Sequence, residues 1–204
     1  MSRTGIGASP QTTTTNALSF LHPSRIAAAL DQRLTAETIR KLQNCRRLEQ
    51  RLAAQMKPGL VAQDLWPIPA SADFLACPAN PQAVARLAGA IWHAASLRLV
   101  VTGKAAAELV ATIGEKAFAF GLRHAAASVG PAQAIGPSEL AHAIDRDGLA
   151  CLGAWLAGEA KPRRDAVLLR LSPEDTEQAR QFSPEHMTAC QSVMTIVMAE
   201  GETS

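Results

Sequence analysis

The stretch GLACLGAWL, from Gly148 to Leu156, is the most informative part of this 204-residue chain. It consists of small and apolar residues, mainly leucine and alanine, and carries one tryptophan near its end. A short basic link follows, and then the leucine-rich segment DAVLLRLSP, which a proline ends at Pro173. Alanine and leucine are among the residues that lose least on entering a helix. The stretch therefore predicts the end of a helix.

The composition extends this prediction to the whole chain. The hydrophobic fraction is 48%, but it includes only five Phe, three Trp and no Tyr. Strands favour aromatic and β-branched residues, whereas this chain takes its apolar mass from alanine and leucine. A chain of this length buries roughly 70% of the surface that its unfolded form exposes, so it can build a core without disulfides or a structural metal. We expect an all-α, compact multi-helix domain that folds without a cofactor.

Composition also predicts how the chain is organised. Residues 1–18 are rich in Gly, Ser, Thr, Gln and Asn, which predicts a disordered tail. Residues 19–204 are expected to form a single helical domain. Within it, the segment 57–81 contains five prolines and several large apolar residues, so it is too broken for a helix and too apolar for a free linker. We expect it to be irregular and packed on the body.

Proline and glycine positions then divide the rest of the chain into helices. The expected helices span about 23–30, 35–56, 81–101, 104–113, 115–128, 138–157 and 184–199. The segment 163–171 is left open between a helix and a strand, although no partner strand is evident. In the 35–56 helix, Thr35 is the expected N-cap.

Charge and cysteine usage exclude several classes of protein. The formal net charge of +2 and the lack of a recognition motif argue against nucleic-acid binding. No window of about 18 residues is free of charge, and the N-terminus has no apolar run typical of a signal peptide. The four cysteines (Cys45, Cys77, Cys151 and Cys190) form no CxxC pair and are expected to be buried thiols. We expect a cytoplasmic protein without direct membrane insertion.

The sequence offers no arrangement typical of catalysis. Gly103-Lys104 lacks the spacing of a phosphate-binding loop, and no two histidines lie three or four residues apart, as helical metal ligands do. Asp145 and Asp147 flank Arg146, but on a helix they point about 160° apart and cannot act as a general acid–base pair. We expect no enzyme activity, no catalytic residue, no cofactor and no metal.

Two features could form a protein interface. Arg40, Arg47 and Arg51 share one side of the expected 35–56 helix. That side is either a solvated face or a docking patch for an acidic partner. Trp66, in the proline-rich segment, is either a core residue or an interface anchor, whereas Trp92 and Trp155 lie on apolar helix faces and are expected in the core.

Five segments, in the right order, resemble the K component of bacterial type III secretion systems, the SctK family with its relatives YscK and PscK. They are FLHPSRI (20–26), WPIP (66–69), RLAGAIWH (86–93), GLACLGAWL (148–156) and LLRLSP (168–173). Together they span residues 20 to about 175.

This resemblance implies an all-α, non-enzymatic adaptor of the secretion sorting platform, with no catalytic residue to carry over. It would link the cytoplasmic domain of the inner-membrane ring protein (the D component) to the C-ring-like Q component, which carries the L stator and the export ATPase. The protein would then lie at the cytoplasmic face of the inner membrane. From the residues alone, a helical ligand-binding regulator and an adaptor or chaperone of an unrelated system remain open.

Overall fold

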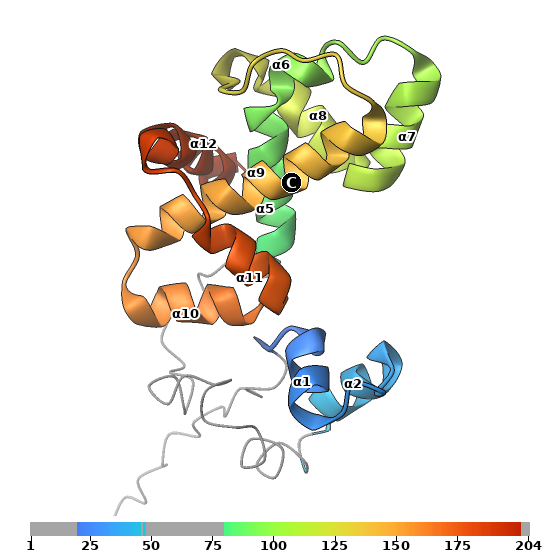
Figure 1. Cartoon of the computed structure of the whole chain (residues 1–204), viewed down its shortest axis with the longest axis vertical. Helices are drawn as coiled ribbons and strands as arrows, with labels where there is room; N and C mark the ends of the chain where they lie inside the picture. The colour runs from blue at the N-terminus through green and yellow to red at the C-terminus, as the bar shows by residue number, and fades with distance from the viewer. Residues whose placement is uncertain (1–19, 46, 48–79, 201–204) are drawn as a thin grey trace, which may run out of the picture.

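The computed structural model describes residues 20–45, 47 and 80–200, and all regular structure in these ranges is helical (Figure 1). The α-helices are α1 (Pro23–Leu30), α2 (Ala36–Gln43), α5 (Pro81–Trp92), α6 (Ala94–Leu97), α7 (Gly103–Ile113), α8 (Glu115–Arg123), α9 (Pro137–Ala157), α10 (Lys161–Leu169), α11 (Pro173–Arg180) and α12 (Met187–Glu200), with 3-10 turns η3 (Ala125–Ala127) and η4 (Pro184–His186). The described residues contain no strand, which confirms the all-α prediction. The segment left open at 163–171 is mostly the helix α10.

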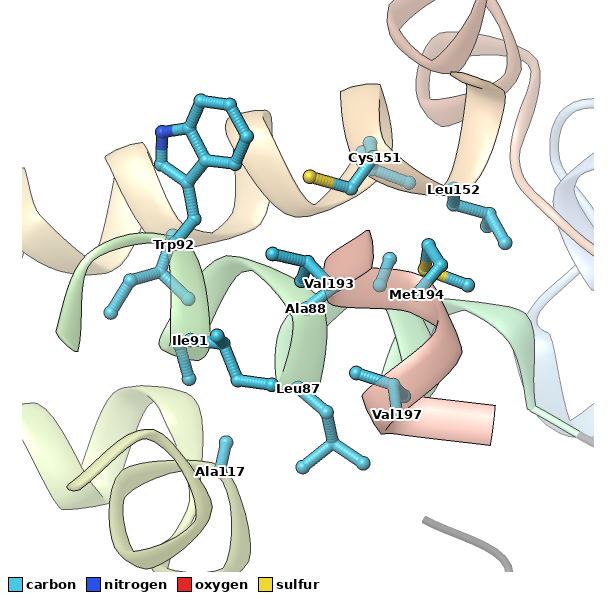
Figure 2. Close-up of a cluster of buried hydrophobic side chains, with 14 of the residues drawn as sticks. Leu87, Ala88, Ile91, Trp92, Ala117, Cys151, Leu152, Val193, Met194 and Val197 are labelled. Carbon is cyan, nitrogen blue, oxygen red and sulfur yellow. The ribbon is translucent and has the colours of Figure 1, made fainter. Parts of the chain in front are cut away.

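Helices α5 and α9 cross at the centre of the molecule, and α7, α8, α11 and α12 pack around them (Figure 1). Helix α8 packs on α5, while α7, α11 and α12 pack on α9. Figure 2 shows side chains of α5, α9 and α12 meeting in one apolar cluster. Ile91, Ile144 and Leu152 are wholly buried there, and each such side chain stabilises the fold by roughly 1.5–3 kcal/mol.

Glycines allow α5 and α9 to touch backbone to backbone. A Cβ atom on Gly89 would overlap the carbonyl oxygen of Ile144, and one on Gly148 would overlap that of Ala85. Such overlaps involve backbone atoms, which cannot rotate away as a side chain can. The crossing therefore requires glycine at both positions, from two segments 59 residues apart in the sequence.

The helix predicted at 81–101 is interrupted at His93, which separates α5 from α6. The carbonyl oxygen of Trp92 accepts hydrogen bonds from the backbone N–H of Gly130 at 2.9 Å and from Oγ of Ser128 at 3.1 Å. The loop after η3 thus donates to a carbonyl oxygen that, in a continuous helix, would accept only the backbone N–H four residues later. Trp92 itself is 8% exposed, so its expected core position is confirmed.

Helices α1 and α2 form a small second cluster around Leu21, Ile26 and Ile39. The side chain of Arg25 fastens this cluster to the body, because it donates to the carbonyl oxygens of Leu171 at 2.8 Å and of Leu168 at 3.1 Å. These carbonyl groups lie at and just beyond the C-terminal end of α10, where a cation is favourable.

The structure corrects the sequence prediction in two further places. The helix expected over 35–56 is wrong as one element: Thr35 caps it as predicted, but α2 ends at Gln43, and Asn44 is its C-cap. The Gln43 side chain donates to the carbonyl oxygen of Leu21 at 2.8 Å, which ties the last turn of α2 to the segment that leads into α1. Helix α11 was not predicted at all.

Two predictions fall on residues that the structure does not describe. The tail expected at 1–18 lies outside the described ranges. So does almost all of the irregular segment expected at 57–81, apart from Asn80 and Pro81, which begin α5. Both stay predictions.

Candidate functional site

A groove of about 540 Å³ lies on the polar side of the α5–α9 crossing. Its walls come from α5, the loop before α9, α9 itself and α11. The polar side chains that line it include Gln82, Arg86, His93, Gln133, Glu139 and Asp175. We refer to it as the central groove.

A bidentate ion pair links the two crossing helices in the central groove. Arg86 on α5 donates from Nε to Oδ1 of Asp145 at 2.7 Å and from Nη2 to Oδ2 at 3.0 Å. The two side chains are 29% and 36% exposed. Paired hydrogen bonds of this kind fix geometry as well as charge, so this pair sets the register of α9 against α5.

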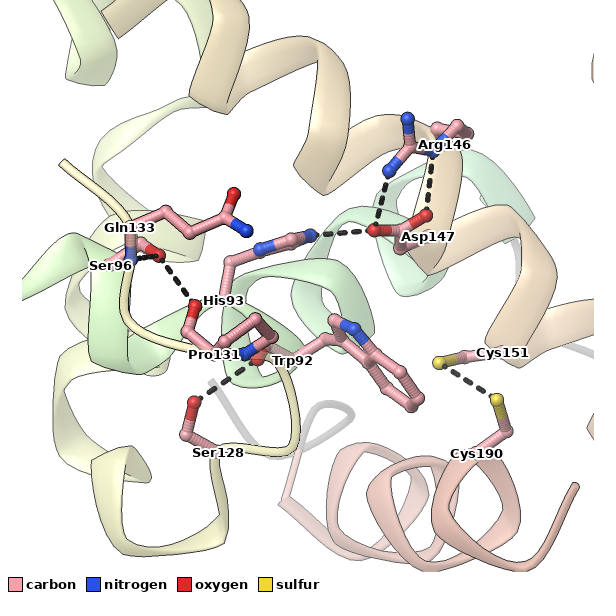
Figure 3. Close-up of polar contacts among 10 residues, drawn as sticks. All are labelled: Trp92, His93, Ser96, Ser128, Pro131, Gln133, Arg146, Asp147, Cys151 and Cys190. Carbon is pink, nitrogen blue, oxygen red and sulfur yellow. Dashed lines mark hydrogen bonds and ion pairs between the residues drawn. The ribbon is translucent and has the colours of Figure 1, made fainter. Parts of the chain in front are cut away.

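A second group of charged side chains joins the end of α5 to α9 (Figure 3). Nε2 of His93 lies 2.7 Å from Oδ2 of Asp147, and Arg146 donates to the same carboxylate from Nε at 2.7 Å and from Nη2 at 3.0 Å. Burial alone would raise the pKa of Asp147, but the hydrogen bonds from His93 and Arg146 outweigh it and lower the pKa to about 2. Asp147 is therefore an anion at neutral pH.

The ionised carboxylate fixes the proton on one nitrogen of His93. An anion can only accept a hydrogen bond, so Nε2 of His93 carries a proton and donates to Asp147. In Figure 3 the side chain of Gln133 points toward this ring. Within the described part of the chain, no serine, threonine or cysteine side chain bonds to His93. The pair therefore has no nucleophile to activate there.

Metal-binding geometry is likewise absent from the described ranges. No group of three or more His, Cys, Asp and Glu side chains is arranged there to hold an ion. What the central groove offers is a set of hydrogen-bond acceptors and fixed charges.

Two buried thiols meet between α9 and α12. Sγ of Cys151 on α9 donates to Sγ of Cys190 on α12 at 3.4 Å, and both residues are 2% exposed or less. The hydrogen bond to Cys190, with burial, raises the pKa of Cys151 above its ordinary range, so Cys151 remains a thiol. The expectation of buried free cysteines is confirmed for this pair.

The structure does not gather the arginines that the sequence singled out. Arg40 and Arg47 are both exposed, but the break at Asn44 separates them, so they do not share one face of a continuous helix. Arg51 and Trp66 lie outside the described residues. Their role at an interface stays a prediction.

Sequence reasoning missed the central groove. The triplet Asp145-Arg146-Asp147 was the available signal, and its two carboxylates do point to different partners, Arg86 and His93. Those partners lie 59 and 54 residues away in the chain, and only the helix crossing brings them near.

Two known proteins are similar to this chain. They are the nodulation proteins NolU of Rhizobium fredii and of Sinorhizobium fredii strain NBRC 101917 / NGR234, each 42% identical over 182 residues. The match covers 89% of this chain and 83% of each relative. The chain belongs to the NolU family.

The match to NolU extends over nearly all of the chain, so the family shares the helical fold of Figure 1. No family model matches this NolU-family chain, and no solved structure shows a significant match to it. Among the residues described, none of its helices is both long enough and apolar enough to cross a membrane.

Proposed function

We propose that this NolU-family protein is a non-enzymatic adaptor of a type III secretion sorting platform. In this proposal it links the cytoplasmic domain of the inner-membrane ring protein to the C-ring-like component at the cytoplasmic face of the inner membrane. It acts through binding surfaces alone and carries no catalytic residue or cofactor.

The observation that supports the proposal most is how the segments resembling the K component meet in space. The segments 86–93 and 148–156 form the α5–α9 crossing, where Gly89 and Gly148 make the backbone contact. The segments 20–26 and 168–173 also meet, through the hydrogen bonds of Arg25. Four of the five resembling segments thus form two packed pairs. Segments that pack on one another are the ones a shared fold depends on, so this pairing supports the resemblance.

The chemistry of the central groove is consistent with binding. Its charged side chains are held in fixed geometry by one another, as in Arg86–Asp145. Preorganised charges of this kind favour specific association and steer partners. The His93–Asp147 pair has no nucleophile bonded to it among the described residues, so it gives no reason to propose catalysis.

The proposal is tested by co-expression with each partner from the same genome. We expect the full chain to co-purify with the C-ring-like component and, in a separate experiment, with the cytoplasmic domain of the ring protein. The matched control is the Gly148→Val variant, which should disrupt the α5–α9 crossing and lose both partners. Failure of the wild-type chain to bind either partner contradicts the adaptor role.

A helical ligand-binding regulator is the second candidate, because the central groove has the volume of a small-molecule site. A thermal-shift screen of metabolites separates the two. A ligand that raises the melting temperature of the wild type, but not of an Arg86→Ala variant, would favour the regulator.

A further inference from the structure

The thiols of Cys151 and Cys190 face each other across the contact between α9 and α12 (Figure 3). Their Sγ atoms are 3.4 Å apart, and both cysteines are free. A disulfide holds its sulfur atoms about 2.05 Å apart, so these two atoms have to approach by about 1.4 Å to form one. Rotation of the two side chains about χ1 moves sulfur atoms on this scale, so neither helix has to unfold.

Helix α12 is the element that such a bond would fasten. It follows the other described helices in the chain, and apolar side chains such as Val193, Met194 and Val197 attach it to the body. A bond between Cys151 and Cys190 would add a covalent link, across 39 residues of chain, to an attachment that is otherwise mainly apolar. The stabilisation by a disulfide grows with the length of the loop that it closes.

A small oxidant can reach the pair from the side of α12. Cys151 is wholly buried and Cys190 is 2% exposed, but the next two residues, Gln191 and Ser192, are exposed. Cys190 therefore lies one residue from solvent. Hydrogen peroxide is little larger than water, so a small local opening of α12 admits it, and such openings are common in helices near chain ends.

We propose that Cys151 and Cys190 form a reversible disulfide between α9 and α12 when a peroxide oxidises the protein. Hydrogen peroxide converts one thiol to a sulfenic acid and releases a water molecule. The other sulfur attacks the sulfenic sulfur, and its proton leaves with the sulfenic hydroxyl as a second water. The cysteine pair thus loses two electrons, which reduce the peroxide. A dithiol reverses the reaction by thiol–disulfide exchange.

This site does not depend on the adaptor function, and it is tested on the native full chain. The protein is treated with hydrogen peroxide, its remaining thiols are alkylated in denaturant, and it is digested with trypsin without reductant. Trypsin releases Cys151 in the peptide 147–163 and Cys190 in the peptide 181–204. We expect mass spectrometry to find these two peptides joined, and to find them separate after dithiothreitol. Absence of the joined peptides, or linkage of either one to Cys45 or Cys77 instead, overturns the proposal.

A melting experiment tests whether the bond fits the fold. Half of the oxidised sample is reduced with dithiothreitol, and the oxidised half should melt about 5 °C or more above it. Cys151→Ala and Cys190→Ala are the matched controls, since each lacks one sulfur and should show no such difference. Cys45→Ser keeps the pair and should show the full difference. A lower melting temperature in the oxidised wild type, or an equal rise in either alanine variant, overturns the proposal.

Discussion

The two sides of the α5–α9 crossing differ in almost every physical respect, although the same two helices form both. On the apolar side, Gly89 and Gly148 bring the backbones together, and Ile144 and Leu152 are fully buried. On the polar side, ion pairs hold the helices while a cavity of about 540 Å³ stays open. The comparison teaches that backbone contact and apolar packing close one side of the crossing completely, whereas the ion pairs on the other side hold the helices and still leave a cavity open.

The largest effect should come from filling the glycine contact. Gly148→Ala places a methyl group against the carbonyl oxygen of Ala85, and overpacking against rigid backbone costs about 3 kcal/mol or more. The control is Gly103→Ala, where no atom lies within 4 Å of the new Cβ. Urea unfolding should show a large fall in the unfolding free energy for Gly148→Ala. For Gly103→Ala the unfolding free energy should change by less than about 0.5 kcal/mol. Equal midpoints would show that the crossing is looser than described.

Next in size is the contrast between two tryptophans. Trp92 is 8% exposed, so Trp92→Ala should cost about 3–5 kcal/mol of unfolding free energy. Trp155 was expected to be equally buried, but it is only partly buried, with the guanidinium of Arg163 5.2 Å above its ring. Trp155→Ala should therefore cost roughly half as much. The melting temperatures of the two variants measure this difference. A larger fall for Trp155→Ala than for Trp92→Ala would contradict the prediction.

On the polar side, Asp147 should contribute a pH-dependent stability of about 2 kcal/mol. Its pKa of about 2 in the folded protein lies below the value of about 3.8 for the unfolded chain. The carboxylate therefore stabilises the fold above pH ~4, and this stability is lost as the pH falls toward 2.

Asp147→Asn should accordingly be less stable than wild type at pH 7, and the difference should shrink as the pH approaches 2. Chemical unfolding at several pH values measures it. Glu37→Gln is the control, since Glu37 pairs with Lys41 on an exposed surface where both side chains are 75% exposed. If the difference in unfolding free energy between Asp147→Asn and wild type stays constant across this pH range, Asp147 is not the source of the pH-dependent stability.

The smallest effect on stability is expected at the arginines of the N-terminal region. Arg40→Glu/Arg47→Glu/Arg51→Glu should leave the melting temperature unchanged, since Arg40 and Arg47 are exposed and no ion pair is described for either. If these residues dock an acidic partner, the triple variant should bind it more weakly and with a flatter salt dependence. Unaltered binding to both proposed partners would return the three arginines to an ordinary solvated surface.

The sequence was sufficient for most helices, because local signals decide where a helix begins and ends. Pro23 and Pro81 open helices as expected, and α9 begins at Pro137, one residue before its predicted start. Helix α11 was missed because PEDTEQAR has almost no apolar residues to reveal a period, although Ser172 followed by Pro173 and Asp175 is a start signal.

The central groove could not be predicted in the same way. His93 meets Asp147 and Arg86 meets Asp145 only because α5 crosses α9 at Gly89 and Gly148. The sequence does not show at what angle two helices more than 50 residues apart will cross, or which of their side chains will then face each other. Such contacts depend on tertiary packing, so a single sequence indicates the helices but not the site between them.

The central claim, that this NolU-family protein links two proteins, is tested most directly by reconstituting all three. The full chain, the C-ring-like component and the cytoplasmic domain of the ring protein are mixed, and the molar mass is measured by size-exclusion chromatography with light scattering. We predict one complex that contains all three proteins and that does not form when this chain is left out. Two partners that associate equally well without it, or that compete for it rather than bind together, would contradict the adaptor account.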